Sequence, residues 1–206
     1  MKLPYLLSSS SGSNDSGSSS ELTNGATYRI KNVNSSLYMQ VDSAKQANGI
    51  NVKQLGASDK SAHDVWKLVN ADSGYYYLIS QIGDGNTYYL NVAGSSSVNG
   101  SNIVINKFTG EDSQKFLLTK NSDGSYIIKT KVSNNQSAVE VANGGKGSGE
   151  NIQQWNLNNY PNQNWIFESA SVKLRAKNDL PKKEEDIVKT EIYKDDGLVH
   201  TVVFVK

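Results

Sequence analysis

Two of the three tryptophans in the chain lie in one polar stretch, ENIQQWNLNNYPNQNW, at residues 150–165. Trp155 and Trp165 each follow a glutamine by two positions, and the residues between them are mostly Asn, Tyr and Pro. An aromatic ring offers a flat apolar face, and Asn and Gln amides both donate and accept hydrogen bonds. We expect one tryptophan in the core and the other on the surface, as part of a binding site.

Groups that could catalyse a reaction are scarce. His63 and His200 are the only imidazoles, and they lie in different regions with no recognisable nucleophile motif. A glycosidase needs two carboxylates at a defined separation. Near the polar stretch these are Glu140 and Glu150, neither in an apolar context that favours burial. Residues 144–147, GGKG, lack the spacing of a P-loop and are interpreted as a turn. We therefore expect no enzymatic activity, no cofactor and no metal.

Composition excludes other classes of function. The net charge of +1 argues against nucleic-acid binding, which needs a basic excess. The chain has no cysteine, which excludes disulfides, thiolate catalysis and Cys-ligated zinc. No apolar run approaches the ~18 residues that span a bilayer. Many Asn, Ser, Gly, Val, Ile and Tyr residues favour short strands joined by polar turns.

The elements that must position the polar stretch repeat three times. Units begin at Gly25, Gly74 and Gly124, so the spacings are 74 − 25 = 49 and 124 − 74 = 50. The same register relates Val41, Val92 and Val141; Gly49, Gly100 and Gly149; Asn51, Asn102 and Asn151; and the closing aromatics Trp66, Phe116 and Trp165. The first unit reads as four short strands at 28–33, 37–41, 51–55 and 64–68. Three four-stranded units that close on one another predict an all-β protein with a β-trefoil fold. Its repeats would cover about 25–72, 73–122 and 123–169.

The two ends of the chain differ from the middle. Residues 8–20, SSSSGSNDSGSSS, have no apolar side chain, so residues 1–21 are predicted to be a flexible linker to a partner domain. Residues 171–206 hold 8 Lys/Arg and 7 Asp/Glu, which marks 22–169 as the trefoil and 170–206 as a charged tail. Alternating residues on both sides of Asp196 and Gly197 predict a β-hairpin in this tail.

The repeated pattern resembles a known family. Tyr-x-Ile, Leu-x-Val, Asn-Gly-x-Asn-Val-x-x-Trp and Gln-x-Trp recur in register over residues 25 to about 169, as in the ricin-type β-trefoil lectins. The similarity is greatest to bacterial family 13 carbohydrate-binding modules, which are attached to secreted polysaccharide-degrading enzymes. It implies sugar binding without catalysis, in up to three shallow pockets. Each pocket would combine an acidic residue, a stacking aromatic and an Asn-Gln pair before the closing tryptophan.

The third repeat retains this set in full. The resemblance makes Glu140 the acid and Trp155 the stacking aromatic, so Trp165 would be the core tryptophan. The remaining expected site residues are the amide pair Asn162 and Gln163, with Gln153 on the same strand face as Trp155 and Tyr160 as a second apolar wall. The alternatives are a buried Trp155 and a solvated Glu140 without contacts.

The first two repeats depart from the pattern. The corresponding positions are Gln40, Leu55, His63 and Asp64 in the first repeat and Asn91, Asn106, Phe108 and Gln114 in the second. Neither has an acid at the Leu-x-Val position or an aromatic directly at the stacking position. Phe108 would stack only if its loop turned it outward. We expect both pockets to be degenerate and to be kept for the architecture.

The resemblance and the linker together predict a monomeric, extracellular carbohydrate-binding module. Its partner would be a plant-type polysaccharide or oligosaccharide containing galactose, xylose or arabinose, and it would hold a covalently linked glycoside hydrolase on that substrate. Nucleic acids and membranes are not expected partners. The alternatives are a protein-interaction trefoil, such as a protease inhibitor, and a lectin for cell-surface glycans, such as the binding subunit of a toxin.

Overall fold

The computed structural model describes the backbone of residues 21–57, 62–170, 187–195 and 198–205, and the side chains of the first two ranges. The trefoil is all-β, as predicted, with four strands in each of three repeats. The first repeat holds β1 (Thr27–Asn32), β2 (Tyr38–Val41), β3 (Ile50–Leu55) and β4 (Val65–Asn70). The second holds β5 (Tyr76–Ser80), β6 (Tyr88–Val92), β7 (Ile103–Lys107) and β8 (Phe116–Lys120). The third holds β9 (Tyr126–Thr130), β10 (Ser137–Val141), β11 (Ile152–Asn156) and β12 (Asn164–Ser169).

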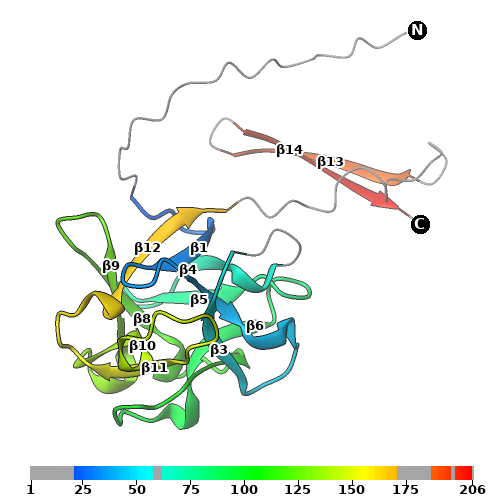
Figure 1. Ribbon diagram of the computed structural model, residues 1–206. Coiled ribbons are helices and arrows are strands. Elements are labelled where there is room, and N and C mark those ends of the chain that lie inside the picture. Colours follow the sequence, from blue (N-terminus) through cyan, green and yellow to red (C-terminus); the bar gives the residue numbers. More distant parts are fainter. Residues whose placement is uncertain (1–20, 58–61, 171–186, 196–197, 206) are drawn as a thin grey trace, which may run out of the picture. The chain divides into compact units, whose positions relative to one another are not determined.

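The first and last strands of the repeats close into a barrel (Figure 1). Antiparallel pairs join β1 to β4, β4 to β5, β5 to β8, β8 to β9, β9 to β12 and β12 back to β1. The middle strands of each repeat form hairpins, β2–β3, β6–β7 and β10–β11. Closure of the barrel satisfies the edges of its strands, which no single repeat could do alone.

The core follows from alternation along the strands. In β1 every second residue is buried, so Tyr28, Ile30 and Asn32 face inward. The three closing aromatics, Trp66, Phe116 and Trp165, are fully buried in the core. The indole nitrogens of Trp66 and Trp165 donate to the backbone carbonyls of Met39 and Val139, both at 2.9 Å. The burial of these polar groups is thereby compensated.

Three asparagines at matching positions form a closed ring of hydrogen bonds. Asn51 donates to Asn151 at 2.9 Å, Asn151 donates to Asn102 at 2.9 Å, and Asn102 donates to Asn51 at 2.7 Å. Each side-chain amide is a donor to one repeat and an acceptor from the other. The recurrence of Asn in the sequence therefore has a direct structural cause.

The turn glycines also link each repeat to the next one around the barrel. Gly49, Gly100 and Gly149 have φ of 77°, 82° and 94°, a region that disfavours other residues. The amide of each glycine donates to the next repeat around the barrel, to the carbonyls of Ile105, Gln154 and Gln54 at 2.9, 2.9 and 2.7 Å. The three turns therefore fix the hairpins against one another.

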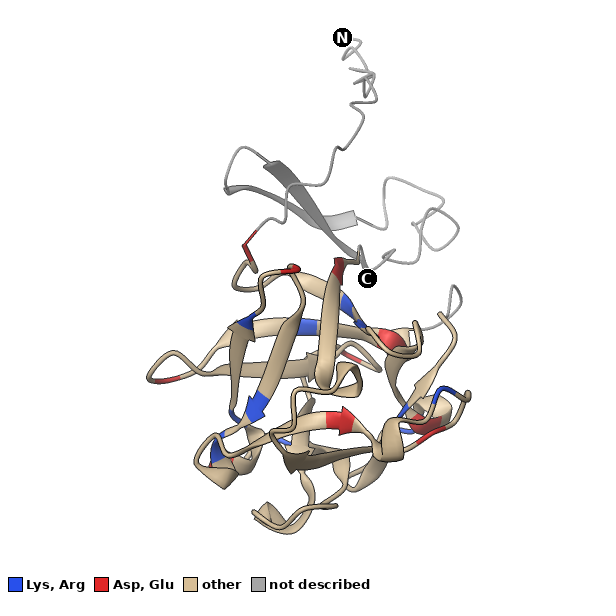
Figure 2. Ribbon diagram, turned by 60° about the vertical axis from the view of Figure 1, so that its left-hand side comes forward, with Lys and Arg blue, Asp and Glu red and all other residues tan. Residues whose placement is uncertain are grey.

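In the view of Figure 2, positions of Lys and Arg and positions of Asp and Glu are both spread over the described part of the trefoil. Among the residues described, no helix is long and apolar enough to cross a membrane.

The tail forms a second compact unit, residues 172–206. Strands β13 (Ile187–Asp195) and β14 (Leu198–Val205) pair antiparallel on either side of residues 196–197, where the sequence predicted a hairpin turn. Three parts of the chain lie outside the described residues: residues 1–20 of the expected linker, residues 171–186, and the turn residues 196–197.

Breaking the asparagine ring should destabilise the whole trefoil. Asn102→Ala removes one donor and one acceptor, and we expect it to lower the free energy of unfolding by about 1–3 kcal/mol. Urea denaturation measures the change. Ser97→Ala, at an exposed position of the same repeat, is the control and should stay within about 0.5 kcal/mol of wild type. Equal effects of the two substitutions would show that the ring does not hold the repeats together.

Candidate sugar-binding site

A pocket of about 480 Å³ opens beside the third repeat. Strand β10 supplies Glu140, β11 supplies Gln153 and Trp155, and the segment around the 3-10 helix η7 (Pro161–Gln163) supplies the rest. Its lining residues are Asn34, Glu140, Asn143, Gly144, Gln153, Trp155, Asn158, Tyr160, Pro161 and Asn162. Five of the six expected site residues line this pocket; Gln163 does not.

The carboxylate of Glu140 lies at the base of the site, with 3% of the residue exposed. Gln153 Nε2 donates to its Oε1 at 3.0 Å, and Asn162 Nδ2 and Gln163 Nε2 donate to its Oε2 at 3.2 and 2.9 Å. Three amide donors replace the water that burial removes. A solvated Glu140 without contacts is therefore wrong, and Glu140 is buried although no burial was predicted for it.

Trp155 is the exposed tryptophan, at 41%, whereas Trp165 is fully buried, as predicted. The cross-strand partner of Trp155 on β10 is Ala138. In the first and second repeats the residues equivalent to Ala138 are Tyr38 and Tyr89. The small side chain of Ala138 adds little bulk opposite the indole. Tyr160, 66% exposed, lies in the lining of the same pocket.

Gln163 is fully buried and supports the site without lining it. In addition to its bond to Glu140, it donates to the carbonyl of Asn156 at 2.9 Å and accepts from the amide of Asn158 at 3.1 Å. Gln114 holds the equivalent loop of the second repeat, with bonds to the Lys107 carbonyl and the Thr109 amide at 2.9 and 2.8 Å. We expected Gln163 to contact the ligand; its position instead makes it a residue that orients Glu140.

Three asparagines of the lining, Asn34, Asn143 and Asn158, were not predicted. Asn34 comes from the first repeat, where the buried Asn32 holds the β1–β2 loop by accepting from the amide of Asn34 at 3.1 Å. The Asn34 side chain then donates to the carbonyl of Gly144 at 2.9 Å. The many Asn residues near position 158 could have predicted that Asn158 lines a polar site. The contribution of Asn34 crosses from one repeat to another and leaves no local pattern.

The first repeat has a different set of contacts at the equivalent place. Gln40 is buried and donates to the carbonyl of Gly56, so its amide is engaged within the repeat. Lys53 stands opposite Gln40, in the place of Gln153, and pairs with Asp42 at 2.9 Å. Asp64, the counterpart of Gln163, is buried and pairs with Arg29 at 2.9 Å.

The remaining positions of the first repeat do not restore the sugar-binding set. Leu55 takes the position of Trp155, opposite Tyr38, and has no ring to stack. His63, the counterpart of Asn162, is partly buried in the 3-10 helix η2 (Ala62–Asp64).

The second repeat has also lost the acid. The amide of Asn91 donates to the carbonyl of Val92 at 2.8 Å, and its oxygen accepts from Ser113 at 3.1 Å. Asn106, in the position of Trp155, accepts from the amide of Gly49 at 2.8 Å.

Phe108 in the same repeat is turned outward and 55% exposed. Its ring packs against Tyr77 and Tyr89, with centroids 5.4 and 5.0 Å away. The second repeat thus has an exposed ring but an amide, Asn91, in the position of Glu140.

Replacing the buried carboxylate should test how the site is held. Glu140→Gln keeps the shape but places an amide NH₂ against at least one of the three donors, so we expect a loss of about 1–3 kcal/mol in unfolding free energy. Glu150→Gln is the matched control, because Glu150 is exposed and lies outside the pocket lining. A Glu140→Gln variant as stable as the control in chemical denaturation would contradict the proposed network.

Comparison with known proteins agrees with this geometry. Residues 18–106, 84–155 and 112–180 each match the family described as ricin-type beta-trefoil lectin domain-like. No curated protein sequence matches the chain significantly.

Solved structures show the same fold. The designed threefold-symmetric protein ThreeFoil is 26% identical with a TM-score of 0.65, covering 70% of this chain and 99% of its own. An exo-beta-1,3-galactanase from Clostridium thermocellum is 22% identical with a TM-score of 0.63, covering 70% of this chain and 30% of its own. The ricin B-like lectin of Macrolepiota procera, solved with lactose, is 16% identical with a TM-score of 0.59, covering 73% of this chain and 100% of its own.

The matches to three overlapping segments and the closed barrel of three repeats agree with one another. The chain belongs to the ricin-type beta-trefoil lectin domain-like family.

Proposed function

We propose that the chain is a non-catalytic carbohydrate-binding module whose sugar site is the pocket of the third repeat. The observation that carries this proposal is the buried Glu140, held by three amide donors in the same pocket as the exposed ring of Trp155. A pyranose has the matching chemistry, with a C–H face for the ring and hydroxyl groups for the carboxylate.

The hydrogen-bonding capacity of the site favours a ligand that donates. A carboxylate has about four acceptor sites, and three amide donors already bind Glu140. Both N–H bonds of the Asn162 amide are engaged, by Glu140 and by the carbonyl of Val141 at 2.9 Å, which leaves its side-chain oxygen as an acceptor. Hydroxyl groups of a sugar are suitable donors to both residues.

The charge of the site favours a neutral sugar. Glu140 is the one ionisable acid in the lining, and the lining contains no Lys, Arg or His. A uronate or sulfate would approach this carboxylate without a compensating cation, and like charges in a partly desolvated site repel. Neutral galactose, xylose and arabinose polymers remain the candidates.

The arrangement supports binding rather than hydrolysis. Glu150, the other acid considered from the sequence, is exposed and lies outside the pocket lining, so the pocket lacks the second carboxylate that glycoside hydrolysis uses. Among the described residues, no group of three or more His, Cys, Asp and Glu could hold a metal ion.

The proposed setting is a secreted, monomeric module linked to a glycoside hydrolase. The Ser- and Gly-rich residues 8–20 have the composition of a flexible linker. The similar structure in the exo-beta-1,3-galactanase is 30% of a longer chain, which is the arrangement expected of an appended module. Such a module raises the effective concentration of a tethered enzyme at its substrate.

A glycan-binding screen tests the function. Wild type should bind a neutral galactan, xylan or arabinan with a dissociation constant of about 10 µM to 1 mM, since an open pocket makes few desolvated contacts. Trp155→Ala should weaken that binding by about 1–3 kcal/mol, by analogy with other stacked ligands. Phe108→Ala, which removes the exposed ring of the second repeat, is the matched control and should leave binding unchanged.

Other outcomes of the screen would redirect the proposal. Loss of binding with Phe108→Ala and not with Trp155→Ala would move the site to the second repeat. Preference for sialylated or sulfated animal glycans would overturn the neutral-sugar proposal. A wild type that retains no glycan would favour a protein-interaction trefoil.

A further inference from the structure

A second pocket, of about 280 Å³, lies next to the proposed sugar site. Its lining comes from the β8–β9 turn (Asn121, Ser122 and Asp123), β9 (Ile127), the loop before η7 (Asn159) and the start of β12 (Asn164). Four of these six side chains are amides or hydroxyls, and one is apolar. Its lining, like that of the first pocket, has one carboxylate and no cation.

One short loop separates the two pockets. Asn158 and Tyr160 line the first pocket, and Asn159, between them in the chain, lines the second. Asn159 has φ of 60°, and the amide of Tyr160 donates to the Asn158 side chain at 2.9 Å, which fixes the loop locally. The exposed Tyr160 therefore lies at the divide between two polar pockets.

The second repeat has different residues at the place equivalent to this second pocket. Lys115 directly precedes the closing aromatic Phe116, as Asn164 directly precedes the closing aromatic Trp165. The carbonyl of Lys115 accepts from the amide of Lys131 at 3.0 Å, and that of Asn164 accepts from Val33 at 2.9 Å. Lys115 is thus equivalent to Asn164, and Lys131 to Val33.

Two turns between strands provide a further pair of equivalent positions, Asp72 and Ser122. Asp72 lies in the β4–β5 turn, closed by the bond from Ala71 N to Tyr75 O at 2.8 Å. Ser122 lies in the β8–β9 turn, closed by the bond from Asn121 N to Ser125 O at 2.8 Å. Asp72 is therefore equivalent to Ser122.

The fourth position is set by the 3-10 helices. Asp112 begins η4 (Asp112–Gln114) as Pro161 begins η7. Asp112 and Pro161 are therefore equivalent.

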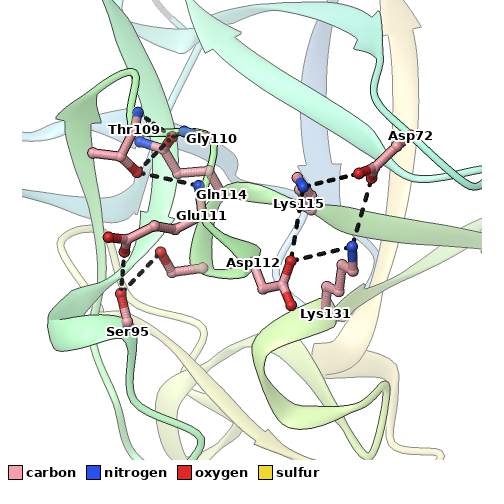
Figure 3. Close-up of polar contacts among 10 residues, drawn as sticks. Asp72, Ser95, Thr109, Gly110, Glu111, Asp112, Gln114, Lys115 and Lys131 are labelled. Atoms are coloured by element: carbon pink, nitrogen blue, oxygen red, sulfur yellow. Dashed lines mark hydrogen bonds and ion pairs between the residues drawn. The ribbon is translucent and has the colours of Figure 1, made fainter.

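Asp72 of the first repeat, Asp112 and Lys115 of the second, and Lys131 of the third form a network of ion pairs (Figure 3). Lys115 pairs with Asp72 at 3.1 Å and with Asp112 at 3.8 Å, and Lys131 pairs with Asp112 at 3.1 Å and with Asp72 at 3.5 Å. The hydrogen bond from Lys115 holds the pKa of the Asp72 carboxyl below its ordinary value. The two long lysine side chains cover this part of the surface.

At the four equivalent positions near the second pocket all the charges are replaced by uncharged residues: Ser122, Pro161, Asn164 and Val33. The shorter Asn164 and Ser122 leave the pocket open at the place equivalent to the one where Lys115 and Asp72 meet. The opening thus occurs beside the site that retains Glu140 and Trp155, whereas the second repeat, one of the two that lack both, is associated with the ion pairs.

We propose that this second pocket is a subsite for another unit of a neutral oligosaccharide whose first unit binds beside Trp155. This inference rests on the proposed function and extends it from a single sugar to a chain that crosses Tyr160. Asn159 and Asn164 offer amides to sugar hydroxyls, and Ile127 offers an apolar surface to the ring. One oxygen of the single carboxylate, Asp123 Oδ1, accepts from the amide and hydroxyl of Ser125 at 2.9 and 2.6 Å and is thus engaged within the turn.

The internal comparison provides the test. Ser122→Asp combined with Asn164→Lys introduces at the second pocket the same ion pair that Asp72 and Lys115 form. The new side chains should fill the second pocket and leave the first intact. Calorimetry on the full chain would use galactose, xylose and arabinose and the linear neutral oligosaccharides of each, up to the hexasaccharide. Wild type should bind the preferred oligosaccharide about tenfold tighter than its monosaccharide. The double variant should lose this gain and keep wild-type affinity for the monosaccharide.

The reverse exchange, Asp72→Ser combined with Lys115→Asn, is the matched control and should leave the chain-length gain unchanged. A double variant that keeps the gain, or a wild type that binds monosaccharide and oligosaccharide equally, overturns the subsite. If Trp155→Ala still abolishes binding in that case, the proposed function stands without it. A wild type that binds none of these sugars overturns both proposals.

Discussion

Closure of three repeats around one axis is the constraint on which the rest of the trefoil depends. No repeat can satisfy its own strand edges, and the ring of Asn51, Asn102 and Asn151 links all three in a single cycle of hydrogen bonds. Because the barrel, the ring and the glycine turns use backbone groups and a few recurring side chains, the surfaces of the hairpins are free to diverge. The fold can keep its architecture while only one repeat retains a carboxylate beside an exposed tryptophan.

That divergence explains the asymmetry of the molecule. In the third repeat, a buried acid is compensated by amides from two segments of the chain, and an exposed indole lines the same pocket. The first and second repeats use the equivalent positions for internal bonds: Gln40 to its own loop and Asn91 to Val92 and Ser113. Such replacements preserve the satisfaction of buried polar groups, which the fold requires, and sacrifice the acceptors that a sugar would need.

The sequence predicted the features that repeat. Trp66, Phe116 and Trp165 recur at one register because the core demands a large side chain there, and the strands expected for the first repeat lie within two residues of those observed. The burial of Glu140 was missed because the donors that make it tolerable, Gln153, Asn162 and Gln163, lie 13 to 23 positions further along the chain and meet the carboxylate only in the folded structure. The role of Asn34 and the second pocket were missed because both depend on contacts between repeats, and neither follows from a periodic pattern.

The central claim is that sugars bind at the third repeat, and nuclear magnetic resonance of the indole N–H groups tests it most directly. The indoles of Trp66 and Trp165 are buried and donate to backbone carbonyls, so a sugar cannot contact them. During titration with neutral galacto-, xylo- and arabino-oligosaccharides, the Trp155 indole and the side-chain amides of Gln153 and Asn162 should shift with one dissociation constant. Shifts confined to residues of the first or second repeat, with the Trp155 signal unmoved, would contradict the account.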